Sequence, residues 1–203
     1  MRLNLRLKDE AWSELIIIKR TGQNAPASPN LQVLKRVMRN KMDISFRMAS
    51  PSDYAILEEL RLEAFSPIFA SFRKILGDEI YELAQKREDE EQKELLSSMH
   101  SGESKWDLYV AEVKNKIVGF VSVKVNMETK VGEIGLNAVI PSYSGQGIGT
   151  KMYDFANKRM KAAGMRVATV ATGGDESHAP ARRAYEKSGF NINIPSVWYC
   201  RKL

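Results

Sequence analysis

The sequence has little of the chemistry that builds disulfides, metal centres or membrane spans. Its 203 residues include one cysteine, Cys200, and two histidines, so an internal disulfide is excluded and a Cys/His zinc site is not expected. Apolar runs such as LIII at residues 15–18 are far shorter than the roughly 20 residues that cross a bilayer. We therefore expect a cytoplasmic protein with no bound metal and no membrane partner.

The positive charge is confined to the start of the chain. Residues 1–41 carry nine basic and three acidic side chains, whereas residues 42–203 carry 22 of each. The stretch TGQNAPASPN, at residues 21–30, has the composition of a linker. We predict a basic N-terminal extension over 1–41 and one main domain over 42–203. Because the main domain is neutral, nucleic acid is not its expected partner, although contact of the extension with nucleic acid or an acidic protein stays an alternative.

Hydrophobic periodicity predicts the first half of the main domain. The stretch DISFRMA alternates like a strand, and a helix follows with Ser50 or Ser52 as its N-cap. We expect Pro67 to interrupt this helix. The next predicted elements are a helix or helix pair over roughly 68–98 with a break near Gly77, and strands over 107–113, 116–126 and 131–140.

The second half alternates helices and strands. We predict a helix over about 147–163, a buried strand over 165–172 and a helix that ends at Gly189. The closing stretch SVWYCRKL is a predicted strand, with Cys200 buried or half-buried and Trp198 as a packing anchor. This order indicates a single α/β domain around a mixed sheet.

The stretch PSYSGQGIGTKMY, at residues 141–153, places three glycines between a strand and a helix. Glycine lets the backbone bend sharply and approach a ligand closely, and the first N–H groups of a helix attract anions. The N–H groups of about Gln146 to Thr150 are therefore expected to converge on a pyrophosphate. The Walker pattern fails here, and the dinucleotide pattern has Thr150 where its third glycine belongs, so dinucleotide binding stays a weaker alternative.

Two motifs carry a family resemblance. VIPSYSGQGIGTKMYDFA is similar to the acyl-CoA signature of the GNAT N-acetyltransferases, and HAPARRAYEKSGF resembles a later helix of that family. They stand about thirty residues apart, in the right order, with one strand between them. The resemblance covers roughly residues 42–203. It departs from the family at Ser144, where arginine or glutamine is usual, and at His178, where asparagine is common.

The resemblance implies a mixed, mostly antiparallel central sheet flanked by helices, with acetyl-CoA as acyl donor. It implies that the strand before the loop separates from its neighbour near a β-bulge at Asn137–Ala138 and binds the pantetheine arm. The residues expected to contact acetyl-CoA are Val139, Ser144, Gly145, Gln146, Gly147, Ile148, Gly149, Thr150 and His178.

Acetylation of an amine needs a base and an acid. A lysine-like amine has a pKa of about 10.4, so a base must remove its proton before it attacks. Glu133, on the central strand, is the expected catalytic base, and Asp107 and Glu112 are weaker candidates. Tyr185 occupies the tyrosine position of the family and is the expected catalytic acid for the leaving thiolate.

The resulting hypothesis is an N-acetyltransferase, an acyl-CoA-dependent enzyme that transfers an acetyl group to a primary amine by direct attack in a ternary complex. The alternative is a non-catalytic acyl-CoA-binding sensor or regulatory module. The acceptor is a small-molecule or peptide amine, and Phe65, Phe69 and Phe72 are expected to give its pocket a partly apolar floor. A homodimer is compatible with the sequence.

Overall fold

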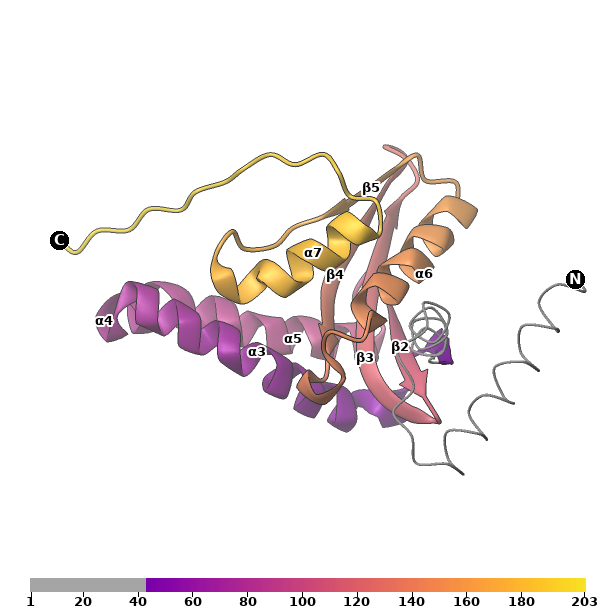
Figure 1. Cartoon of the computed structure of the whole chain (residues 1–203), viewed down its shortest axis with the longest axis horizontal. Coiled ribbons are helices and arrows are strands. Elements are labelled where there is room, and N and C mark those ends of the chain that lie inside the picture. Colours follow the sequence, from indigo (N-terminus) through magenta and orange to yellow (C-terminus); the bar gives the residue numbers. More distant parts are fainter. Residues whose placement is uncertain (1–42) are drawn as a thin grey trace, which may run out of the picture. The chain divides into compact units, whose positions relative to one another are not determined.

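The computed structural model describes residues 43–203, so the predicted extension over residues 1–41 lies outside the described residues. Five strands form one sheet in the order β1-β2-β3-β4-β5 (Figure 1). Each neighbouring pair among the first four is antiparallel, and β5 runs parallel to β4. The strands are β1 (Ile44–Met48), β2 (Asp107–Val113), β3 (Lys116–Asn126), β4 (Val131–Val139) and β5 (Val167–Val170).

Helices cover both faces of the sheet and join β1 to β2 and β4 to β5, whereas short turns join β2, β3 and β4 (Figure 1). Between β1 and β2 the chain forms a short turn η1 (Pro51–Asp53), then α3 (Tyr54–Leu76), α4 (Asp78–Ile80), the π-helical turn η2 (Tyr81–Gln85) and α5 (Lys86–Ser101). After β4 come η3 (Pro141–Tyr143), α6 (Ile148–Ala162), then β5, η4 (Glu176–His178) and α7 (Ala179–Lys187). The expected mixed, mostly antiparallel sheet flanked by helices is confirmed.

The core consists of two apolar layers, one on each side of the sheet. On one face α3 and α5 bury Leu57, Leu60 and Leu96 against strand residues that include Val110 and Phe120. On the other face the stripe of α6 is buried, as its spacing predicted; its members are Ile148, Met152, Ala156 and Met160. Each fully buried aliphatic side chain contributes about 1.5–3 kcal/mol, so these two layers fix the sheet on which the rest is built.

Three local predictions are wrong. Pro67 does not interrupt α3, which continues to Leu76, because the turns on either side of the proline stay helical. The chain after α7 forms no strand, and Cys200 and Trp198 on it are exposed rather than packed. The strand β5 is shorter than predicted, and Val167 is 53% exposed instead of buried, since no further strand of the described chain covers that edge.

A buried carboxylate ties β1 to the start of α3. Asp53 accepts two hydrogen bonds from the Arg47 guanidinium, at 2.7 and 3.0 Å, and one from the Ser50 N–H at 2.7 Å. Arg47 also donates to Glu112 on β2 at 2.9 Å. These hydrogen bonds, led by those from Arg47, hold the pKa of Asp53 well below its ordinary value near 3.8. Together with Arg47, the Asp53 carboxylate therefore connects β1, β2 and the start of α3.

We expect Asp53→Asn to lower the free energy of unfolding by about 1–3 kcal/mol at pH 7, because the neutral amide loses charged hydrogen bonds. The folded-state pKa is depressed, so this stabilisation is present above about pH 4 and is lost as the pH falls toward the folded-state pKa. Urea titrations at pH 7 and pH 3 measure both effects. The control is Asp78→Asn, whose carboxylate is 83% exposed beside Arg73 and should cost little at either pH. Equal losses of unfolding free energy in Asp53→Asn and Asp78→Asn would contradict the prediction.

Candidate functional site

The glycine loop between β4 and α6 has the backbone shape that its composition predicted. Gly145 and Gly147 have φ of +72° and +80°, a left-handed conformation that side-chain-bearing residues rarely adopt. Helix α6 begins at Ile148, and the Lys151 N–H is the first to bond back, to the Gly147 carbonyl at 3.2 Å. The N–H groups just before Lys151 therefore lack an intrahelical partner, and such donors at a helix N-terminus attract anions.

The remaining loop residues hold this shape. Ser144 is exposed and extended, and its N–H bonds to the Pro141 carbonyl at 3.0 Å. The Gln146 side chain donates to the Ser142 carbonyl at 3.2 Å, so this amide braces the loop. Thr150 lies half-buried in the first turn of α6, and Gly149 lies there too, beside Ala184 of α7. The predicted loop residues are thus contiguous, and most of them are open to solvent.

The two parallel strands separate directly before this loop. Pairing between β4 and β5 covers Val131 to Ile134 and ends at Ile134 opposite Val170, although β4 continues to Val139. A bulge accompanies the separation, because Val121 pairs with Asn137 while Val123 pairs with Ile134, which leaves one extra residue on β4. The last residues of β4, Val139 among them, therefore have backbone groups on the β5 side that no strand within residues 43–203 pairs.

A buried polar cluster lies at the separation and joins three elements. Asn137 of β4 accepts a hydrogen bond from the Tyr153 hydroxyl of α6 at 2.8 Å, and its amide nitrogen donates to the Tyr185 oxygen of α7 at 3.2 Å. The rings of Tyr153 and Tyr185 lie 4.4 Å apart. Both phenols are more than nine-tenths buried. The sequence predicted Tyr185 as a site residue but missed Asn137 and Tyr153, its partners.

The environment of Tyr185 suits a proton donor. Burial is the main reason that its pKa lies above the ordinary value near 10, so the phenol is protonated at neutral pH. The bond from Asn137 occupies a lone pair of the oxygen, and a hydroxyl that accepts one bond still has its own proton to donate. Burial likewise raises the pKa of Tyr153, together with the neighbouring Tyr185.

Glu133 lies on the paired part of β4, opposite Lys124 of β3. Its carboxylate forms an ion pair with Lys124 at 2.7 Å, and the Lys124 ammonium also lies 4.3 Å from the centre of the Trp106 ring. The Glu133 side chain is 42% exposed, so both solvent and a competing cation have access to it. The weaker candidate Glu112 is engaged by Arg47 near the far edge of the sheet.

His178 lies in η4, at the entry to α7. Its Nδ1 is 2.6 Å from the Asp175 carboxylate, and its ring stacks on Phe72 of α3 with centroids 5.6 Å apart. The predicted aromatic floor is therefore divided. Phe65 and Phe69 contact each other edge to face, whereas Phe72 connects α3 to the start of α7.

Two further findings bear on the class of site. No helix among residues 43–203 combines the length and apolarity that crossing a bilayer requires. The same residues contain no group of three or more histidine, cysteine, aspartate or glutamate side chains placed to hold a metal ion.

The mixed five-strand sheet flanked by helices, which opens between β4 and β5 before a glycine-rich loop, matches the fold of GNAT acetyltransferase structures. The model of the Acetyltransferase (GNAT) family matches residues 69–190. The chain therefore belongs to the GNAT acetyltransferase family. No curated protein sequence matches it.

Solved structures of this family share the fold. The PaiA N-acetyltransferase from Thermoplasma acidophilum, in complex with coenzyme A, is 20% identical with a TM-score of 0.58 over 76% of this chain and 94% of that one. A GNAT-family acetyltransferase from Desulfovibrio desulfuricans is 19% identical, with a TM-score of 0.56 over 74% and 87%. One from Brucella melitensis, in complex with acetyl-CoA, is 17% identical, with a TM-score of 0.50 over 76% and 93%.

We expect Asn137→Ala to lower the free energy of unfolding by about 1–3 kcal/mol, because two buried hydroxyls lose a partner at once. Urea unfolding measures the change as a shift of the midpoint at constant slope. The matched comparison is Tyr153→Phe, alone and combined with Asn137→Ala. Since the two residues share one hydrogen bond, the double variant should lose less than the sum of the single losses. Strict additivity would show that the cluster is not energetically coupled.

Proposed function

We propose that the protein is an N-acetyltransferase that moves an acetyl group from acetyl-CoA to a primary amine by direct attack in a ternary complex. The observation that carries this proposal is the position of the Tyr185 hydroxyl, buried beside Asn137 where β4 leaves β5, directly before the glycine loop. Three groups follow one another at this point, and each suits one part of acetyl-CoA. The helix N-terminus suits the diphosphate, the unpaired strand backbone suits the pantetheine amides, and the protonated phenol suits the thioester sulfur. That family members are solved with coenzyme A and acetyl-CoA supports this choice of donor.

In this proposal each part of the donor meets a different group. The backbone N–H groups over residues 145–150, with Ser144 and the Thr150 hydroxyl, bind the diphosphate. The unpaired backbone of β4 at Val139 binds the pantetheine amides and positions the thioester carbonyl near a backbone donor. His178 of η4, whose ring is held by the Asp175 carboxylate, is a further proposed contact of the donor.

The proposed reaction needs two proton transfers. The neutral amine attacks the thioester carbon, the C–N bond forms, and the C–S bond breaks as the tetrahedral intermediate collapses. Tyr185 gives its proton to the leaving thiolate, and the proton lost by the amine passes to Glu133, directly or through water. Glu133 must exchange its ion pair with Lys124 for the substrate proton, and its partial exposure leaves room for that exchange.

The Lys124–Glu133 pair is also the observation that favours the alternative, a non-catalytic module that only binds acyl-CoA. A carboxylate that stays paired does not act as a base. Release of coenzyme A from acetyl-CoA, measured with a broad panel of small-molecule and peptide amines, distinguishes the two. Acceptor-dependent release supports the enzyme, whereas tight acetyl-CoA binding without release for any amine supports the module.

The anion site predicts that Gly147→Asp abolishes detectable acetyl-CoA binding. An added Cβ at this position meets nothing within 4 Å, although any side chain strains the backbone at its positive φ, and the carboxylate repels the diphosphate. Isothermal titration measures the affinity. The matched control is Gly147→Asn, which has nearly the same shape and places the same demand on the positive φ without the charge. If Gly147→Asp kept its affinity for acetyl-CoA, the donor would bind elsewhere on the protein. If both variants lost affinity equally, backbone strain and not charge would be the cause.

The role of Tyr185 predicts that Tyr185→Phe lowers kcat by about 100-fold, the lower end of the range for losing a general acid, with little change in acetyl-CoA affinity. Steady-state kinetics and titration of the same samples measure both. Tyr153→Phe is the matched control, because it removes another buried hydroxyl from the same cluster. If both variants lost activity equally, Tyr185 would be a structural residue and not the acid.

A further inference from the structure

The strand β5 is an unprotected edge of the sheet. It pairs with β4 on one side, and no strand of the described chain lies on the other. Its sequence, VATV, has no charge and no proline, the devices that usually keep an edge from pairing with another chain. Val167 and Thr169 are exposed. Such an edge is a template for one more strand.

The residues that follow α7 form what we call the C-terminal arm, residues 191–203. The arm makes no regular secondary structure, and every residue in it is exposed (Figure 1). Its large apolar side chains would normally be covered. The relative solvent exposure of these side chains is 58% to 116%. They are Ile192, Ile194, Val197, Trp198, Tyr199 and Leu203.

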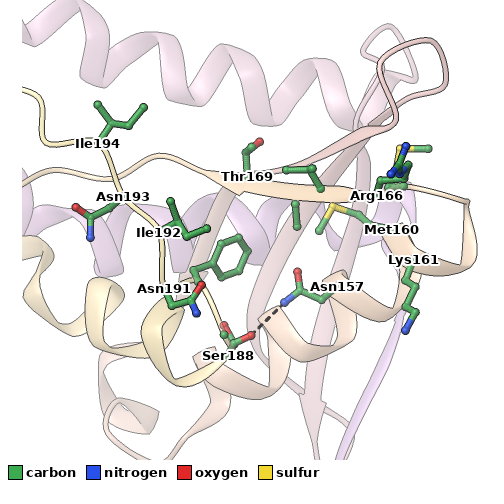
Figure 2. A pocket seen from close by; sticks show the side chains of 15 residues that line it. Asn157, Met160, Lys161, Arg166, Thr169, Ser188, Asn191, Ile192, Asn193 and Ile194 are labelled. Carbon is green, nitrogen blue, oxygen red and sulfur yellow. Dashed lines mark hydrogen bonds between the residues drawn. The ribbon is translucent and has the colours of Figure 1, made fainter.

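A groove of about 660 Å³ lies between β5 and the first part of the arm (Figure 2). Val167, Ala168 and Thr169 form one wall, and residues 190–194 form the other. Met160 and Asn157 of α6 also line it. The carbonyl oxygen of the Asn157 side chain is buried without a hydrogen-bond partner among the described residues. The groove thus combines an unpaired strand edge, apolar walls and an unsatisfied acceptor.

The distal half of the arm does not turn back into this groove. A tight hairpin after Ile194 would use residues with positive φ, which glycine supplies most readily. The chain has no glycine after Gly189, and no residue of the arm has a positive φ. Instead the arm continues past Pro195 toward α4, where the Lys202 ammonium pairs with Glu79 (Figure 1). The apolar residues of the distal half, Val197, Trp198 and Tyr199, thus do not line the groove, whereas Ile192 and Ile194 of the same arm do.

We propose that the groove binds residues 196–202 from the C-terminal arm of a second copy of this chain. Seven extended residues span about 23 Å, more than the length of β5. The incoming strand pairs its backbone with β5, buries alternate side chains against the groove, and brings an N–H donor within reach of Asn157. Because each copy supplies one arm and one groove, the exchange is reciprocal and closes as a two-fold symmetric dimer.

A cross-linking experiment tests the exchange directly, since Cys200 is the only cysteine of the chain. The full chain with Thr169→Cys carries one thiol on β5 and one on the arm. A short bismaleimide should yield a covalent dimer on a denaturing gel, with peptide mapping showing a link between positions 169 and 200. A cross-linked monomer would place the arm in its own groove, and no link would place it elsewhere. Either result overturns the proposal.

The controls separate other geometries. The unmodified chain, which has Cys200 alone, and Thr169→Cys combined with Cys200→Ser, which has the β5 thiol alone, should give no covalent dimer. A dimer from the β5 thiol alone would mean that two β5 edges face each other directly. That result also overturns the exchange.

Light scattering after size exclusion gives an independent test. The unmodified chain should have the mass of a dimer, and Tyr199→Asp, at a side chain that is 87% exposed, should yield a folded monomer. The matched control is Met127→Asp on the β3–β4 turn, 58% exposed, which should remain dimeric. An unmodified chain that is monomeric, or a dimer that survives Tyr199→Asp, would refute the arm as the interface.

Discussion

The site depends on where the parallel ladder between β4 and β5 ends. Four residues of each strand pair, and from the bulge to the end of β4 that strand is paired with β3 but no longer with β5. If the ladder continued, the backbone groups near Val139 would be used within the sheet. The bulge and the short β5 therefore produce the opening, and the core layers of α3, α5 and α6 hold the sheet rigid around it. The polar cluster of Asn137, Tyr153 and Tyr185 is built at the same point, so the opening and the candidate acid have a common origin.

Local sequence patterns predicted most of the fold, because most elements are specified locally. The glycine loop, the buried stripe of α6 and the β2–β3 hairpin follow from turn chemistry and periodicity, and the structure has them where they were expected. Pro67 was misjudged because a proline's local preference is weaker than the packing of a 23-residue helix. The final strand was misjudged for a different reason. The pattern SVWYCRKL favours a strand, but a strand also needs a partner, and the chain gives it none among its own described residues.

The site was predicted only in part because its contacts are distant in sequence. Tyr185 stood out through the motif on α7, and the loop residues are contiguous. Nothing in the sequence indicated that Asn137, 48 residues before Tyr185, would hydrogen-bond to it, or that Tyr153 would complete the cluster. Lys124 as the partner of Glu133 follows from the β3–β4 register, which a hairpin prediction without a bulge position does not supply. Sequence motifs singled out individual residues, and only the topology of the fold shows which other residues lie beside them.

The two halves of helix α3 make different contacts. Its buried residues, Leu57, Leu60 and Arg61, all precede Pro67, whereas the later turns contact α4, η2 and the His178 ring. Proline gives no N–H to the preceding turn, so the two halves are joined by one fewer backbone bond. Residues after Pro67 can therefore change during evolution without repacking the core. The proline thus separates the part of α3 that is buried in the core from the part that is not.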